Sequence, residues 1–208
     1  MQQFKSWLME NLVSKFITQE MEDHFIARTL THINTVVENG LYLMNNFDLN
    51  DDKKYKFLAN LNEHDKSKFL KPEKDFYVIL SWKYHLKEDE FKKLNLPQWL
   101  QDDVNKASDH HLKSNKHHPE YWDKSLIRNF LDPNDRDSMF KNKIVDATEM
   151  PLVHLLEMIC DWVSVSREQS SDPEQWAKEN VNKRWKFTDE QVDIIYKVIA
   201  IFKDHFNL

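Results

Sequence analysis

The chain has 208 residues, enough to bury a full core within one domain. Its net charge of −6 excludes a general affinity for nucleic acid or for anionic membranes, so a polyanionic ligand would need a local basic pocket. The only glycine, Gly40, excludes glycine-rich phosphate loops, and the only cysteine, Cys160, excludes an intramolecular disulfide. Residues 1–22 hold no long apolar run, so they predict neither a signal peptide nor a membrane span, and we expect a cytoplasmic location.

Apolar residues recur at helical spacing along almost the whole chain, which predicts an all-α fold. The predicted helices cover residues 6–16, 19–46, 51–61, 73–94, 97–115 and 149–169, and a last one runs to about residue 206. Pro119 can open a short helix, and Asp132–Asp135 predicts a turn. Thr188 and Gln191 form a capping-box pattern before the last helix. No stretch alternates with period two for long enough to predict a sheet.

The domain organisation follows from the same pattern. We expect one domain over residues 1–208 with a helical core over about 20–169. A soft boundary at Ser170–Pro173 would precede accessory C-terminal helices over about 172–206.

Two histidines and two aspartates stand in an order that predicts a metal site: His32, then His64 directly followed by Asp65, then Asp161. Nitrogen and hard oxygen donors together suit Zn, Mn, Fe, Ni or Co, whereas Mg alone would favour oxygens. An ionised Asp161 in an apolar helix would be costly to bury without a partner, and a cation is a natural one.

This order resembles the HD-domain superfamily of helical proteins, most of which are metal-dependent phosphohydrolases. Residues 64–68, His-Asp-Lys-Ser-Lys, are similar to its HD-x-G-K motif, with Ser67 where glycine is usual. Residues 115–122, Asn-Lys-His-His-Pro-Glu-Tyr-Trp, are similar to the His-His-Glu segment of members that hold two metal ions. In residues and spacing the motifs are closest to those of an uncharacterised viral and bacterial branch with HD-x-S-K, HHPEYW and EM-x-x-DW. The resemblance implies an HD-domain-like helical bundle, over roughly residues 28–165.

Further residues are candidates for binding a second metal ion or the substrate. His117 and His118, with His111 next, are candidates for a second ion, which Asp65 could bridge. Their alternative is a surface histidine cluster. The candidates for charge balance on phosphate and for stacking on a base are Lys68, Arg28, Tyr121 and Trp122.

Three neighbours receive only supporting roles. Glu157 shares a helix face with Asp161, so it either orients ligands or faces solvent. We expect Glu73 to cap the following helix and Ser67 to assist local geometry.

The resemblance implies a phosphohydrolase that acts on a nucleotide or related small phosphate through water activated by one or two divalent ions, with Asp65 and Lys68 in the catalytic roles. The alternatives are a di-iron oxygenase of the same superfamily and an inactive nucleotide-binding sensor. We expect a small-molecule substrate, with no membrane and no nucleic acid as partner, and a homo-oligomer is compatible with the sequence.

Overall fold

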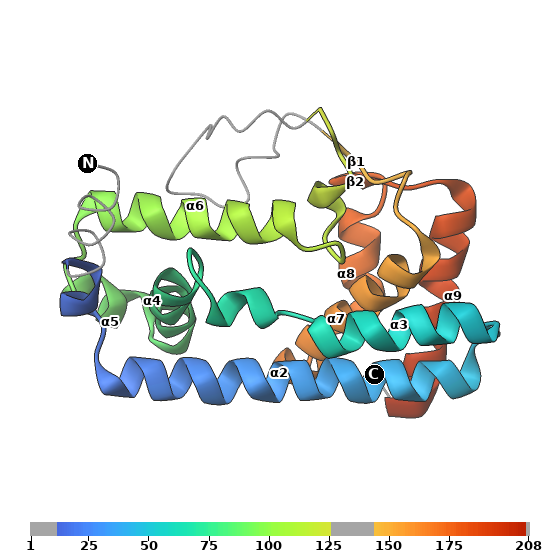
Figure 1. The fold of residues 1–208 in the computed structure, drawn as a ribbon, viewed down its shortest axis with the longest axis horizontal. Helices are drawn as coiled ribbons and strands as arrows, with labels where there is room; N and C mark the ends of the chain where they lie inside the picture. The colour runs from blue at the N-terminus through green and yellow to red at the C-terminus, as the bar shows by residue number, and fades with distance from the viewer. Residues whose placement is uncertain (1–11, 126–143, 207–208) are drawn as a thin grey trace. The chain divides into compact units, whose positions relative to one another are not determined.

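A computed structural model describes residues 12–125 and 144–206 (Figure 1). In chain order the elements are η1 (Ser14–Phe16), α2 (Gln19–Asn46), α3 (Asp51–Glu63), η2 (Lys66–Phe69), α4 (Lys74–His85), α5 (Glu88–Lys93), α6 (Gln98–Ser114), η3 (Pro119–Tyr121), β1 (Val145–Asp146), α7 (Leu152–Gln169), α8 (Pro173–Asn180), β2 (Trp185–Lys186) and α9 (Asp189–Phe206). The all-α prediction is confirmed. Within the described ranges, no helix has the length and apolar character needed to cross a bilayer.

Two predicted helices agree closely with the structure. The helix predicted over 19–46 is α2, and the one predicted over 97–115 is α6. The capping box before α9 is also confirmed, because Thr188 N donates to Gln191 Oε1 at 2.8 Å and Gln191 N donates to Thr188 Oγ1 at 3.2 Å. Strong amphipathic periodicity therefore located most of the helices.

Two predicted helices are wrong in their extent. The helix predicted over 73–94 is divided into α4 and α5, because Leu86 and Lys87 are extended, with ψ of 155° and 150°. Lys87 N donates to Glu90 Oε2 at 3.2 Å and so begins α5. The helix predicted from residue 149 begins at Leu152, because Pro151 disfavours helical backbone in the residue before it.

The ends of the described ranges limit two other predictions. Only the end of the helix predicted over 6–16 is described, and there residues 12–13 are α-helical and Ser14–Phe16 form the 3-10 helix η1. The turn predicted at Asp132–Asp135 lies outside the described residues.

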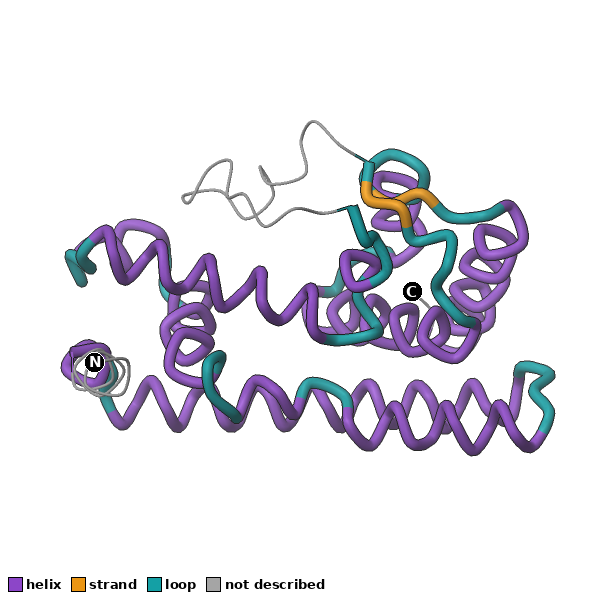
Figure 2. The backbone as a smooth tube through the Cα atoms, turned by 45° about the horizontal axis from the view of Figure 1, so that its top comes forward, coloured by secondary structure: helices purple, strands orange, loops and turns teal. Residues whose placement is uncertain are grey.

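The prediction of no sheet is also wrong in detail. Strands β1 and β2 pair in parallel, with Val145 opposite Trp185 and Asp146 opposite Lys186 (Figure 2). Each strand is two residues long, which is too short to show a period of two in sequence.

Internal contacts divide the chain into two compact units. Of the described residues, the first unit holds 12–30 and 65–111, and the second holds 31–64, 112–125 and 144–206. Each unit has its own apolar core. The core of the first unit centres on Phe25, Val78, Ile79 and Leu100, all nearly or fully buried.

The core of the second unit is built around α7, which packs against α3 and α9 (Figure 1). Leu155 and Ile159 of α7 share this core with Ile195 and Phe202 of α9, and all four are fully buried. The C-terminal helices thus belong to the same core as the helix that carries Asp161.

Gly40 lies inside α2, where it permits a close approach to α3. A Cβ atom at this position would lie 2.2 Å from Leu61 Cδ1, well inside van der Waals contact. Leu61 is fully buried near the C-terminal end of α3, directly before the turn that carries His64. The single glycine of the chain therefore serves helix packing in the second unit and not a turn.

We expect Gly40→Ala to lower the stability of the protein. Overpacking a filled core costs about 1–3 kcal/mol, which exceeds the gain of about 1 kcal/mol from better helix propensity. Thermal unfolding measures the difference, and Asn34→Ala at an exposed position of the same helix is the control. A melting temperature of Gly40→Ala at or above that of the unmodified protein would contradict the close approach.

Candidate metal centre

Helix α7 carries a polar stripe among the apolar residues of its first part, over 152–164. His154, Glu157, Asp161 and Ser164 follow one another at steps of three, four and three residues, which places them on one face of the helix. Their neighbours Leu155, Leu156, Met158, Ile159, Cys160 and Val163 are almost completely buried. The core packing of these apolar residues fixes the direction in which the stripe points.

Glu157 lies at the centre of three histidines. Its Oε1 atom lies 3.0 Å from His64 Nδ1 and 3.2 Å from His117 Nδ1. Its Oε2 atom lies 3.5 Å from His154 Nδ1. Burial raises the pKa of Glu157, but the hydrogen bonds from His117, His154 and His64 outweigh burial and hold the pKa well below its usual value. Glu157 is therefore a carboxylate at neutral pH.

An ionised carboxylate only accepts hydrogen bonds, so His64 and His117 both donate Nδ1–H to Glu157. A neutral imidazole that carries its proton on Nδ1 presents a lone pair on Nε2. This arrangement, in which a carboxylate orients a histidine, is usual around protein metal ions. One glutamate thus fixes the tautomer of two imidazoles, and the ring centroids of His64 and His117 lie 4.2 Å apart.

Asp161 and His32 form the other half of the cluster. Asp161 Oδ1 lies 3.1 Å from His32 Nε2, and the opposite nitrogen of His32, Nδ1, lies 3.0 Å from Ser164 Oγ. Burial raises the pKa of Asp161, whereas the hydrogen bond and the positive charge of His32 lower it more strongly, so the net shift is downward. Ser164 therefore fixes the ring of His32 from the side away from Asp161.

Ligand atoms of His64, His117 and Asp161 all lie within 4.8 Å of one another. Such separations allow one cation to reach all three, since transition-metal bonds to nitrogen and oxygen are about 2.0–2.2 Å long. The set of three donors, with His32 on Asp161, fits a divalent transition ion better than Mg²⁺ because nitrogen outnumbers oxygen. The coarse prediction of a site able to hold a metal ion is thus supported within the second unit.

The end of α3 delivers His64 to this cluster. Helix α3 begins at its N-cap Asn50, whose side chain accepts from Lys53 N at 2.9 Å, and ends at the C-cap His64. Asp65 then adopts a left-handed conformation with φ of 57° and turns the chain. The boundary between the two units falls at this bond, so each unit contributes one residue of the His-Asp pair.

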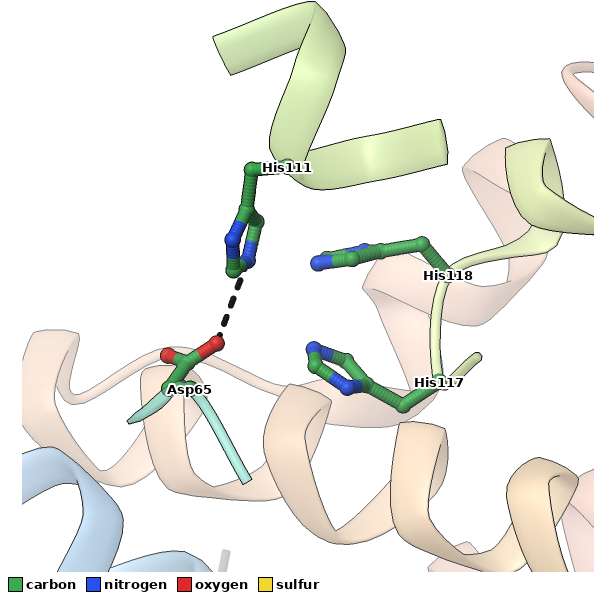
Figure 3. Close-up of side chains that lie close together, drawn as sticks. All are labelled: Asp65, His111, His117 and His118. Atoms are coloured by element: carbon green, nitrogen blue, oxygen red, sulfur yellow. Dashed lines mark ion pairs between the residues drawn. The ribbon is translucent and has the colours of Figure 1, made fainter. Parts of the chain in front are cut away.

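Asp65 contacts two predicted site residues within the first unit. Its Oδ1 atom lies 3.1 Å from His111 Nε2, as the dashed line in Figure 3 shows, and its Oδ2 atom lies 2.5 Å from Lys68 Nζ. Lys68 Nζ also lies 5.2 Å from the ring centroid of Tyr77. Asp65 and His111 are almost fully buried.

Glu73 contacts three side chains of the first unit, those of Ser67, His110 and His111. Its Oε2 atom accepts from Ser67 Oγ at 2.8 Å and lies 2.9 Å from His111 Nδ1, while its Oε1 atom lies 2.7 Å from His110 Nδ1. Burial raises the pKa of Glu73, but the bonds from His111, His110 and Ser67 outweigh it and lower the pKa. Glu73 is the N-cap residue of α4, as predicted, but its side chain makes no cap hydrogen bond and binds the histidines and Ser67 instead.

The remaining predicted residues have distinct surroundings. His118 lies beside His117, with ring centroids 4.2 Å apart, and both come from the loop before η3 (Figure 3). The Trp122 ring lies 5.6 Å from that of His154, and its Nε1 donates to the carbonyl of Lys116 at 2.9 Å.

Tyr121 and Arg28 were predicted to contact the substrate. Tyr121 is exposed and meets Trp122 edge to face. Arg28 is half-buried on the part of α2 that belongs to the first unit.

Sequence reasoning missed two functional candidates, Ser164 and Glu73. Ser164 follows Asp161 by three residues on the same helix face, so helical spacing could have identified it. The partners of Glu73 on α6 are far away in sequence, so no local pattern could have indicated them.

A search of curated proteins and a search of solved structures each gave no match. A family model described as a family of unknown function, DUF5662, matches residues 21–201 and so spans both groups of histidines. The chain therefore belongs to the DUF5662 family of proteins of unknown function.

Proposed function

We propose that this protein is a metal-dependent phosphohydrolase that acts on a nucleotide or a related small phosphate ester. The observation that carries the proposal is the cluster of His64, His117 and Asp161, whose ligand atoms lie within 4.8 Å of one another. Glu157 orients the two histidines, and His32 contacts Asp161. Asp65 is retained as a further ligand on sequence grounds, because it directly follows His64.

A divalent ion held here would supply a water of lowered pKa and a Lewis acid for a phosphoryl oxygen. The residues of the chain have complementary tasks. Glu157 accepts hydrogen bonds from the Nδ1–H groups of His64 and His117, so the lone pairs on their Nε2 atoms stay available to bind a metal ion. Lys68 is the proposed source of positive charge for the phosphate, and its side chain is 19% exposed.

The di-iron oxygenase is the second candidate, and the abundance of imidazole favours it. His32, His64, His117 and His118 all belong to the second unit, and nitrogen-rich sets suit iron as well as zinc or nickel. Iron together with a reaction with oxygen separates the two candidates, because an oxygenase requires a redox-active ion and a hydrolase does not.

The test combines metal analysis with a phosphate-release panel. Purified protein is analysed for bound transition metals, then assayed for phosphate release from mononucleotides, dinucleotides and simple phosphate esters. Metal-dependent release that chelator abolishes and added metal restores is the expected result. Iron with an oxygen-dependent change in absorption would favour the oxygenase, and tight nucleotide binding without product would favour a sensor. Absence of any bound metal would overturn the proposal.

Two substitutions separate ligand from electrostatic roles. Asp65→Ala is expected to reduce metal occupancy and phosphate release together, because it removes a proposed ligand and a negative charge. Lys68→Ala is expected to keep the metal and to lower turnover by roughly 10²–10³-fold through lost charge balance. Both quantities are measured on one active substrate. Full activity in Asp65→Ala would end the mechanism, and unchanged turnover in Lys68→Ala would remove the lysine from it.

A further inference from the structure

His111 has a carboxylate at each ring nitrogen. Nδ1 lies 2.9 Å from Glu73 Oε2, and Nε2 lies 3.1 Å from Asp65 Oδ1. The side chains of His111 and Glu73 are only 2% and 1% exposed, so solvent does little to screen these contacts. The orientation of the His111 ring is therefore set by its contacts with Glu73 and Asp65 rather than by solvent.

The contacts of Ser67 show that Nδ1 of His111 carries a proton. Ser67 Oγ donates its hydrogen to Glu73 Oε2 at 2.8 Å and lies 3.2 Å from His111 Nδ1. Since the hydroxyl hydrogen is directed at Glu73, the oxygen can only accept from His111. Both neighbours of Nδ1 are thus acceptors, and Nδ1 carries the proton.

We infer that Glu73, supported by Ser67, is a positioning residue that holds His111 with its Nε2 atom directed at Asp65. The same carboxylate binds the neighbouring His110 through its other oxygen at 2.7 Å. Glu73 therefore contacts two histidines of the first unit, His110 and His111, through its carboxylate. Glu157 contacts two histidines of the second unit, His64 and His117, in the same way. A serine at position 67, where the resembling motif has glycine, gains a defined task as the third contact of Glu73.

This inference rests on the proposed function, because a metal ion or substrate must meet the His111–Asp65 pair for its orientation to matter. The effect of Glu73 on the tautomer of His111 can nevertheless be measured without turnover. A carboxylate that fixes a histidine tautomer has a spectroscopic signature whether or not any phosphate ester is cleaved.

The test uses the full chain with ¹⁵N-labelled histidine, loaded with Zn²⁺. Long-range ¹H–¹⁵N correlation spectra report which nitrogen of each histidine is protonated, and the His111 signals are assigned by their loss in His111→Gln. We expect Nδ1–H at His111 in the unmodified protein. Glu73→Gln is expected to yield a mixture of tautomers and to weaken Zn²⁺ binding by about 10–100-fold, as is typical when a group that orients a metal ligand is removed.

Asp123→Asn is the matched control. Asp123 is also a buried carboxylate, but it accepts from Ser125 N at 2.9 Å and from Asp146 N at 3.0 Å. Its substitution should leave the His111 signals in place. If Glu73→Gln does not fold, Glu73→Asp replaces it, because the shorter side chain cannot hold both histidines.

An unprotonated Nδ1 at His111 in the unmodified protein, or identical His111 signals after either substitution at position 73, would overturn the inference. A protein that releases no phosphate from any substrate, but shows the expected change in tautomer, would remove the hydrolase and leave the role of Glu73 intact.

Discussion

Asp161→Asn is expected to lower the affinity for a divalent transition metal by more than about 10²-fold and to remove phosphate release with it. Even changes in groups that merely orient ligands cost about 10–100-fold, and this change removes the negative charge of a proposed ligand. Asparagine keeps the shape of the side chain and can still accept a hydrogen bond from His32, so the fold should persist. Competition titration with a coloured chelator measures the affinity.

Asp146→Asn is the control for this substitution. Asp146 is another carboxylate of the second unit with a lowered pKa, caused by hydrogen bonds from Thr148 and by Lys186. It belongs to β1, and its side-chain hydrogen bonds are with Thr148 and Lys186 and not with the histidine cluster. Equal metal affinity in the two variants would show that the cluster around Asp161 is not the metal site.

Glu157→Ala is expected to reduce the free energy of unfolding of the metal-free protein by about 2–6 kcal/mol. The substitution leaves the Nδ1–H groups of His64 and His117 buried without their acceptor, and each such loss costs about 1–3 kcal/mol. Glu157→Gln should cost less, because the amide oxygen can still accept. Urea denaturation in the presence of chelator measures both changes.

Glu149→Ala, at an exposed position just before α7, is the control and should change stability by no more than about 0.5 kcal/mol. A loss in Glu157→Ala no larger than in this control would mean that the carboxylate does not hold the histidines. Metal binding should also weaken in Glu157→Ala, since the two imidazoles would lose their fixed tautomer.

The long helices could be predicted from sequence because their apolar periodicity agrees with their burial. The break between α4 and α5 could not, since neither proline nor glycine marks Leu86 and Lys87. The strands β1 and β2 were equally hidden, because two parallel strands of two residues depend on contacts between positions far apart in the chain.

The candidate site divides in the same way. Residue type and order were enough to select His32, His64 and Asp161, because few side chains bind metals and a buried carboxylate needs a partner. The task of Glu157 stayed open in sequence, since helical spacing shows which face a residue occupies but not which side chains meet it there. The glutamate at position 73 escaped for a stronger reason, because its partners His110 and His111 come from α6.

The left-handed backbone of Asp65 lowers local stability at a position where the proposed function requires a carboxylate. A φ of 57° is a conformation that glycine and asparagine adopt more easily, and a non-glycine residue held in it costs on the order of 1 kcal/mol. The chain nevertheless has a carboxylate there, in contact with Lys68 and His111. A variant library selected only for heat resistance should therefore drift toward asparagine or glycine at position 65. Enrichment of these residues would mark the loss of selection on the site, and their exclusion under selection for activity would mark its use.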